Sequence, residues 1–347
     1  MLTALSCLLL MAESLECRKI RTLERIPVEK DFFLEQVVFI DIDDQGRTYV
    51  TNYPSAQVFY WNKDGSFDGV FGRKGEGPGE YGFGAALGPP RGYISVVDDR
   101  IYIYDGGSRS VSILTRDHGF IRRVTFEGLG GMINGFQVLG KERFLFYDSY
   151  FCAEKACRRI LEYDGTGQLV KSWREVDDDT WSLVDAAGTK VNLFLFQPTL
   201  VMGLHRGRGE VVLAHAANPV LDIHDLTGNK LRSLTLPIPK KPVTKDDIAE
   251  FYDQEWMKNN DHIKAHFPEE KSYFDQILCL DEGYLVYHLS PLHGTADGFL
   301  VGLDGKMKGR FTLECGEGGG LFAPRGRLMA ALVDEEGEFH LTEMRIE

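Results

Sequence analysis

The residues of this 347-residue chain that could bind a metal or activate water are histidines, carboxylates and amides near the ends of predicted strands. Neutral imidazoles can hold zinc, and carboxylate or amide oxygens suit calcium. The zinc candidates are His215, His288 and His293, and the calcium candidates are Asn52, Asp105, Asp148 and Asn218. Side chains of these types at strand ends more often form turns or face solvent. The sequence therefore predicts no resident metal, with zinc or calcium as the alternative.

Other catalytic and nucleic-acid-binding motifs are missing from the sequence. No Gly-x-Ser-x-Gly nucleophile elbow and no Walker phosphate loop occurs. The chain has 52 acidic and 39 basic residues, a net charge of −13 and a pI near 5.2. Such a surface repels phosphate backbones, so nucleic acid is not an expected partner.

A four-strand unit recurs along the chain and decides the fold class. Residues 37–72 contain apolar or alternating segments separated by turn-rich stretches, at Val37–Ile42, Arg47–Thr51, Gln57–Trp61 and Phe67–Phe71. The same pattern returns at 94–126, 136–173, 201–236 and 274–313. Repeats of this length predict the blades of a β-propeller, in which only the innermost strand is apolar on both faces. A two-sheet sandwich is the alternative fold.

The two ends of the chain together supply the remaining blade. Residues 321–347 contain about three strands, and Lys19–Val28 is a strand without a blade of its own. Joining them would complete a sixth blade and remove two open sheet edges. The predicted fold is therefore an all-β, six-bladed propeller of four-stranded antiparallel blades, in which the N-terminal strand completes the C-terminal blade.

Two features resemble known propeller families. The segments Tyr102–Asp105 and Val111–Leu114 are similar to the central strands of NHL-type blades. The loop 71–81, FGRKGEGPGEY, resembles a loop that marks a family of bacterial extracytoplasmic six-bladed propellers. The resemblance implies the fold and an exported location, and it implies little about activity, because propellers host many functions. Within the loop we expect a structural role, with Arg73 pairing Glu80, rather than anion binding.

The N-terminal residues and the cysteines also favour export. Residues 1–12 form an apolar run too short to span a bilayer, so residues 1–14 are predicted to be a signal peptide and 15–347 the propeller domain. No later segment predicts a transmembrane helix. Cys152 and Cys157 bracket a short polar loop and are expected to form a disulfide in an oxidising compartment.

Extra chain is predicted to gather on one face of the ring, around the channel mouth. The insertions 177–198 and 238–273 both precede an innermost strand, and the second contains a predicted helix over 244–258, capped by Thr244. Binding residues tend to lie in loops on a rigid scaffold. The predicted ligand-binding residues at the mouth are Tyr53, Arg73, Asp105, Arg109, Tyr150, His215 and His288.

The predicted function is that of an exported, monomeric and non-catalytic propeller that binds a small molecule or a protein partner at the mouth. The alternative is a metal-dependent hydrolase or lyase at the same face, similar to gluconolactonases or amidating lyases. The Asn-Arg pair of the amidating lyases is absent, and Gly107-Ser108-Arg109 is its nearest approach. Catalytic residues are not identified by the sequence.

Overall fold

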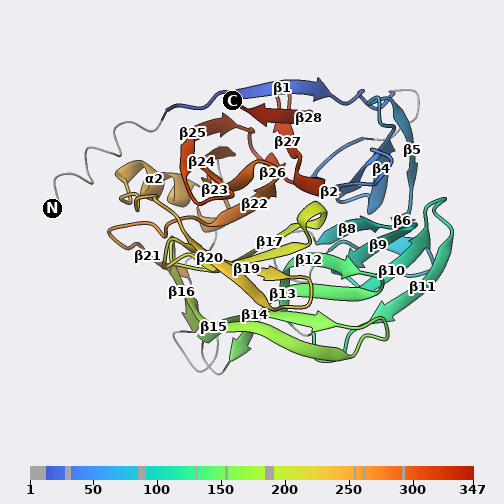
Figure 1. Ribbon diagram of the computed structural model, residues 1–347, viewed down its shortest axis with the longest axis horizontal. Helices are drawn as coiled ribbons and strands as arrows, with labels where there is room; N and C mark the ends of the chain where they lie inside the picture. Colours follow the sequence, from blue (N-terminus) through green and yellow to red (C-terminus); the bar gives the residue numbers. More distant parts are fainter. Residues whose placement is uncertain are drawn as a thin grey trace.

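The computed structural model describes residues 13–27, 33–84, 91–129, 131–152, 155–183, 191–253, 255–258, 260, 263–290 and 294–347. Within these ranges six antiparallel sheets radiate around a central axis, so the six-bladed β-propeller is confirmed (Figure 1). Each blade contains four strands, and blade 3 carries two more.

Blades 1 to 3 follow the predicted repeat. Blade 1 contains β2 (Val37–Ile42), β3 (Thr48–Asn52), β4 (Gln57–Trp61) and β5 (Phe67–Phe71). Blade 2 contains β8 (Gly92–Val97), β9 (Arg100–Asp105), β10 (Ser110–Thr115) and β11 (Phe120–Thr125). Blade 3 contains β12 (Met132–Gly140), β13 (Arg143–Cys152), β14 (Lys155–Tyr163) and β15 (Leu169–Leu183). Between blades 1 and 2 the short strands β6 (Arg73–Lys74) and β7 (Glu80–Tyr81) pair in parallel.

Blades 4 to 6 complete the ring. Blade 4 contains β17 (Leu200–His205), β18 (Glu210–His215), β19 (Val220–Asp225) and β20 (Lys230–Thr235). Blade 5 contains β22 (Gln276–Leu280), β23 (Gly283–Leu289), β24 (Thr295–Gly302) and β25 (Met307–Glu314). Blade 6 contains β26 (Gly320–Phe322), β27 (Leu328–Val333), β28 (Phe339–Ile346) and the N-terminal strand β1 (Cys17–Thr22).

The core consists of apolar side chains packed between neighbouring blades. All five residues of the second strand of blade 1, β3, are buried, whereas the outermost strand β20 alternates between exposed and half-buried residues. This difference follows from position, because inner strands are covered on both faces and outer strands on one.

The ring closes through β1, as the sequence predicts. It pairs antiparallel with β28, from Cys17 opposite Ile346 to Thr22 opposite Thr342. The following residues reach blade 1: the Glu24 carbonyl accepts the Trp61 indole N–H at 2.8 Å. The N-terminal segment thus joins the last blade to the first and covers the outer edge of β28.

The two insertions meet in one sheet. The strand β16 (Val191–Phe194) pairs with β15 and, in parallel, with β21 (Ile263–His266), so both insertions extend blade 3. The helix begins at the predicted cap, where the Asp247 backbone N–H donates to Thr244 Oγ1 at 3.1 Å. The predicted single helix is described in two pieces, α2 (Lys245–Asp253) and α3 (Glu255–Lys258). Among the described residues, no helix has the length and apolarity needed to cross a membrane.

The outer hairpins differ in how they turn. Gly65, Gly228 and Gly305 lie in outer hairpins with φ between 83° and 91°, a conformation that glycine adopts at low cost. In blade 2 the positive φ falls on His118, at 67°, and not on the neighbouring Gly119. His118 stacks on an aromatic side chain of blade 1, and that packing accompanies the unusual backbone conformation of a non-glycine residue.

Candidate functional site

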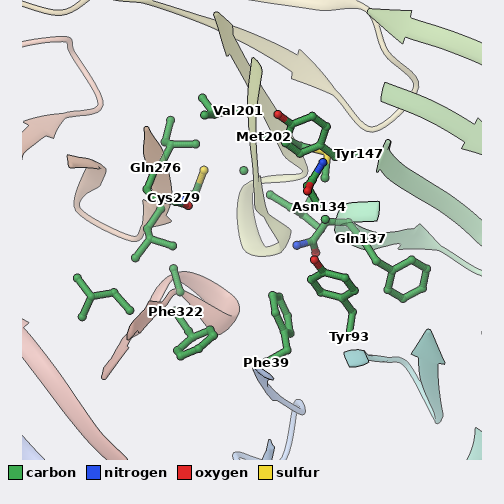
Figure 2. Close-up of a pocket in the computed structure, with 18 of the residues that line it drawn as sticks. Phe39, Tyr93, Asn134, Gln137, Tyr147, Val201, Met202, Gln276, Cys279 and Phe322 are labelled. Atoms are coloured by element: carbon green, nitrogen blue, oxygen red, sulfur yellow. The ribbon is translucent and has the colours of Figure 1, made fainter. Parts of the chain in front are cut away.

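The central channel contains a cavity of about 610 Å³. Residues from the innermost strands of all six blades line it, among them Phe39, Tyr93, Asn134, Met202, Gln276 and Phe322. Figure 2 shows these side chains arranged around the channel. We take this cavity as the candidate functional site, because a volume of this size accommodates a small organic ligand.

One side of the cavity is an aromatic belt formed by Phe322, Phe39 and Tyr93, from blades 6, 1 and 2. The rings of Phe39 and Tyr93 make an edge contact with centroids 5.4 Å apart. Phe39 contacts Phe322 in the same way, at 5.9 Å. All three side chains are half-buried, so part of each ring remains available to a ligand. The aromatic belt suits a planar apolar group.

Amide and hydroxyl groups line other parts of the cavity. Asn134 and Gln276 are solvent-exposed residues of β12 and β22, so a ligand can reach the cavity from solvent. Figure 2 places Asn134 and Gln137 beside Tyr93, with Gln276 on another side. Tyr147 accepts a hydrogen bond of 2.6 Å from Arg158, which also lines the cavity. The cavity therefore combines an aromatic surface with groups that can hydrogen-bond a ligand.

Two arginines form the floor of the cavity. Arg206 follows β17 in a short 3-10 helix (Arg206–Arg208), and Arg325 lies in a second one (Pro324–Gly326) after β26. Arg206 donates to the carbonyl of Val138 at 2.5 Å and to the hydroxyl of Ser95. It therefore connects blade 4 to blades 3 and 2.

Arg325 makes the equivalent connection from blade 6. It donates to the carbonyl of Ile42 at 2.6 Å and to that of Val96 at 3.4 Å. Asp41 accepts the Val96 backbone N–H at 2.7 Å and lies near both arginines. Burial raises the pKa of the Asp41 carboxyl, and the two guanidinium groups oppose that shift. These groups hold the inner strands together at one end of the channel.

The cavity contains one thiol, which the structure makes unreactive. Cys279 in β22 is 1% exposed, and burial raises its pKa to about 12. A thiol with such a pKa carries almost no thiolate near neutral pH, so it is a poor nucleophile. The lining residues that the structure describes include no histidine.

None of the seven predicted binding residues lines this cavity in the described structure. Asp105 is buried and accepts hydrogen bonds from Phe83 N at 2.8 Å and Ser108 Oγ at 2.7 Å, so it organises the loops around it. Arg73 is 78% exposed and pairs with Glu80 at 2.6 Å, as expected from the sequence. The mouth-loop residues therefore support loops, and the sequence did not identify the cavity lining.

The loop 71–81 binds its own carboxylate. Glu80 accepts the backbone N–H groups of Glu76 and Gly77 at 3.1 and 2.8 Å. Arg123 donates to the carbonyls of Gly77 and Glu80, at 2.9 and 3.0 Å. The inward amides are thus already occupied by a side chain of the loop, in agreement with its expected structural role.

The other predicted residues lie apart from one another. Tyr53 precedes a cis peptide bond to Pro54 and is half-buried against the blade 1–blade 2 core. Arg109 is exposed after β9. Tyr150 in β13 donates a hydrogen bond to the Glu175 carboxylate in β15, two strands further out in the same sheet. His215 ends β18 and is half-buried.

His288 lines a second cavity, of about 190 Å³, beneath α2. Its Nδ1 lies 3.3 Å from Asp275 Oδ2, and its buried Nε2 has no hydrogen-bond partner. Two ion pairs also line this cavity, Lys241–Asp297 and Lys271–Asp247, each at 2.6 Å. Because Asp275 lines both cavities, the two are neighbours.

Among the described residues, the predicted zinc and calcium ligands do not form a cluster that could hold a metal ion. The group of three potential ligands found there is Asp334, Glu338 and His340, on blade 6. Arg25 lies 2.8 Å from the Glu338 carboxylate, so an arginine side chain already pairs with this group. His293 lies outside the described residues.

One histidine pair, at residues 262 and 266, has the HxxxH spacing that occurs in some metal sites. Residue 262 lies outside the described part of the chain, and His266 ends the strand β21, where its ring stacks on Phe194 at 4.7 Å. The spacing is typical of a metal site on a helix, and β21 is a strand.

The expected disulfide is not tested by the structure, because the side chain of Cys152 lies outside the described part.

Residues 1–12 of the predicted signal peptide also lie outside the described part. Glu13 and Leu15 exchange backbone hydrogen bonds with Arg310 of β25, at 3.0 and 2.7 Å. The segment before β1 thus runs along blade 5.

The fold and the axial cavity define this chain as a six-bladed β-propeller. No family model matches the chain, and no curated protein matches it in sequence. Solved structures share the fold, including a DUF4221 family member from Bacteroides vulgatus, with 11% identity, a TM-score of 0.55 and coverage of 96% of this chain and 98% of that one. A putative exported protein from Bacteroides fragilis has 13% identity, a TM-score of 0.53 and coverage of 96% and 95%.

A third neighbour is a calcium-binding protein, regucalcin, from Agrobacterium tumefaciens. It has 11% identity, a TM-score of 0.50 and coverage of 95% of each chain. Similarities at this level of identity concern the fold alone, and a propeller fold supports many functions.

Proposed function

We propose that this protein is an exported, non-catalytic propeller that binds a small molecule in its central cavity. The observation that carries the proposal is the form of the cavity: a volume of about 610 Å³ with an aromatic belt, amide side chains and an arginine floor. Apolar walls with a few placed polar groups are typical of small-molecule sites. The ligand site is thus proposed at the axis, and not in the mouth loops.

The chemistry of the lining favours binding over reaction. A general acid or base needs a group that titrates near neutral pH, and the described lining offers one buried and one half-exposed aspartate, arginines, tyrosines and a thiol whose pKa is about 12. Asp41 is already hydrogen-bonded to backbone N–H groups. These groups orient and hold a ligand more readily than they transfer its protons.

Export is part of the proposal and depends on the apolar residues 1–12. It predicts a mature N-terminus near Leu15, which intact-mass spectrometry of protein from its native host will show. A full-length, unprocessed chain in the cytoplasm would contradict export and would leave the cavity proposal standing.

The proposed function is tested by ligand retention. Purified protein is incubated with a small-molecule extract of its native host, washed, and analysed by mass spectrometry for retained compounds. Asn134→Trp places a large side chain at an exposed lining position, and Thr235→Trp places the same side chain on the outermost strand β20. We expect the wild type and Thr235→Trp to retain the same compound and Asn134→Trp to lose at least 90% of it.

Equal retention by all three proteins, or none by the wild type, would refute a cavity ligand. Metal analysis of chelator-free protein accompanies the test. Stoichiometric zinc or calcium that is lost in His288→Ala would replace this proposal with the metal-dependent hydrolase or lyase.

A further inference from the structure

The central cavity has a charge opposite to that of the whole chain. Its charged lining residues are four arginines and two aspartates, a net charge of +2, whereas the chain carries −13. The arginines are Arg91, Arg158, Arg206 and Arg325, and the aspartates are Asp41 and Asp275. A concave site of one sign inside a protein of the other sign concentrates ligands of complementary charge.

The arginines of the floor already have partners within the chain. Arg206 and Arg325 donate to backbone carbonyls and to Ser95, and Asp41 lies near both. Arg158 donates to the Tyr147 hydroxyl at 2.6 Å. These three therefore have structural contacts that explain their positions.

Arg91 differs from them. It directly precedes β8 and is 5% exposed, yet its Nη2 is buried without a hydrogen-bond partner. A buried guanidinium donor without a partner is costly and rare in folded proteins. Arg91 lines the central cavity, and a ligand anion there would supply the missing acceptor once the guanidinium turns toward it.

Among the residues that the structure describes, no carboxylate pairs with Arg91. The groups that act on it electrostatically are Tyr93 and Tyr104, and burial raises the pKa of both phenols, that of Tyr93 to about 12. Both tyrosines are therefore neutral near pH 7. Burial lowers the pKa of Arg91, but a guanidinium is not deprotonated in proteins near that pH, so the arginine remains charged. The positive charge next to the aromatic belt is thus uncompensated by its neighbours.

We infer that the ligand of the central cavity is an organic anion, whose carboxylate or phosphate group is bound by Arg91 while its apolar body lies along the aromatic belt. Tyr93 connects these two parts of the site, since it is two residues from Arg91 and contacts Phe39. The inference rests on the proposed function and adds the chemical class of the ligand to it.

Isothermal titration calorimetry with three compounds that share a phenyl group tests the inference. Phenylacetate and phenyl phosphate carry the anion, and phenylacetamide replaces the carboxylate of phenylacetate with a neutral amide. We expect at least one anion to bind the wild type ten or more times tighter than the amide, and the better anion identifies the charged group. Arg91→Met should abolish that preference, and Arg345→Met, at an exposed position of β28 outside the cavity, should retain it.

Several results would overturn the inference. They are equal binding of the amide and the anions by the wild type, no binding of either anion, or an unchanged preference in Arg91→Met. In these cases the proposed function still stands if the wild type retains a neutral compound that Asn134→Trp loses. Retention by Asn134→Trp as strong as that of the wild type defeats the proposed function itself. Should Arg91→Met not fold, the comparison of acid with amide on the wild type decides.

Discussion

Leu23 tests how the ring closes, because its side chain lies between the last blade and the first. It follows β1 directly, is 4% exposed, and belongs to one core cluster with Ile42 and Trp61 of blade 1 and Leu341 of blade 6. Its backbone N–H donates to the Leu341 carbonyl at 2.8 Å. Replacing Leu23 by Ala therefore removes apolar contacts on both sides of the closure without removing the strand pairing.

The expected cost follows from burial. A fully buried Leu replaced by Ala typically destabilises a protein by about 2–5 kcal/mol, and the strands around Leu23 are held on both sides, so we expect about 3 kcal/mol. An unfolding entropy of about 2.1 cal/mol/K per residue gives roughly 0.7 kcal/mol/K for a chain of this length. The melting temperature should then fall by about 4 °C.

Two optical signals measure the effect. Trp61, one of four tryptophans, is 1% exposed and donates to the Glu24 carbonyl, so its share of the fluorescence reports on the closure. Far-ultraviolet circular dichroism reports on all blades. Leu231→Ala is the control, because Leu231 is 53% exposed on β20. A surface change of this kind should alter stability by less than about 0.5 kcal/mol.

If the ring is closed through β1, all six blades should unfold as one unit. The two signals should change together in urea for the wild type and for Leu23→Ala, and the variant lacking residues 13–24 should lose its cooperative transition. A melting temperature of Leu23→Ala equal to that of Leu231→Ala would refute the closure argument. So would a truncated variant that unfolds like the wild type.

Three further predictions concern other parts of the molecule. In native, non-reduced protein from its host, Cys152 and Cys157 should resist alkylation, and modification of both would refute the disulfide. Burial lowers the pKa of His205 in the folded protein. The contribution of His205 to the free energy of unfolding is therefore fully present above the unfolded pKa of about 6.5, and it is lost as the pH falls through the folded pKa. His205→Gln should reduce the acid dependence of the melting temperature, and an unchanged pH profile would contradict this assignment. Arg206→Met should lower stability by about 1–3 kcal/mol in urea denaturation, because the Val138 carbonyl loses its donor; an unchanged midpoint would show that the floor does not hold the blades.

The architecture could be predicted from sequence because it depends on local patterns. Four short apolar or alternating segments per repeat identify a blade, and turn residues separate them. Closure was predictable as well, since Lys19–Val28 had no blade of its own and the last repeat lacked one strand. The Arg73–Glu80 pair and the Thr244 cap were also predictable, as each joins residues close in sequence.

The lining of the central cavity was not predictable in the same way. Most of its lining comes from the six innermost strands, which contribute between one and five residues each, and the sequence does not show which side of an inner strand faces the axis. Asn134 and Gln276 offered a signal, since each is polar near the start of an otherwise apolar strand. The predicted residues were instead histidines and loop residues at the mouth, of which Arg73 pairs within its own loop and Asp105 holds the loops around it.

The arginine floor was missed for a related reason. Arg206 and Arg325 lie in turns that look like ordinary polar connections in sequence, and their partners are more than 60 residues away along the chain. Only the closed ring brings these turns to the axis. Likewise, the parallel pairing of β16 with β21 joins two insertions that are separate in sequence.

The most direct test of the account is a crystal structure with 4-bromophenylacetate, in which the anomalous signal of bromine locates the ligand. We predict one bromine site in the central cavity beside Phe39, Tyr93 and Phe322, with the carboxylate within hydrogen-bonding distance of Arg91 Nη2. A bromine site in the cavity beneath α2, or in the mouth loops with the central cavity free of ligand, would contradict the central claim.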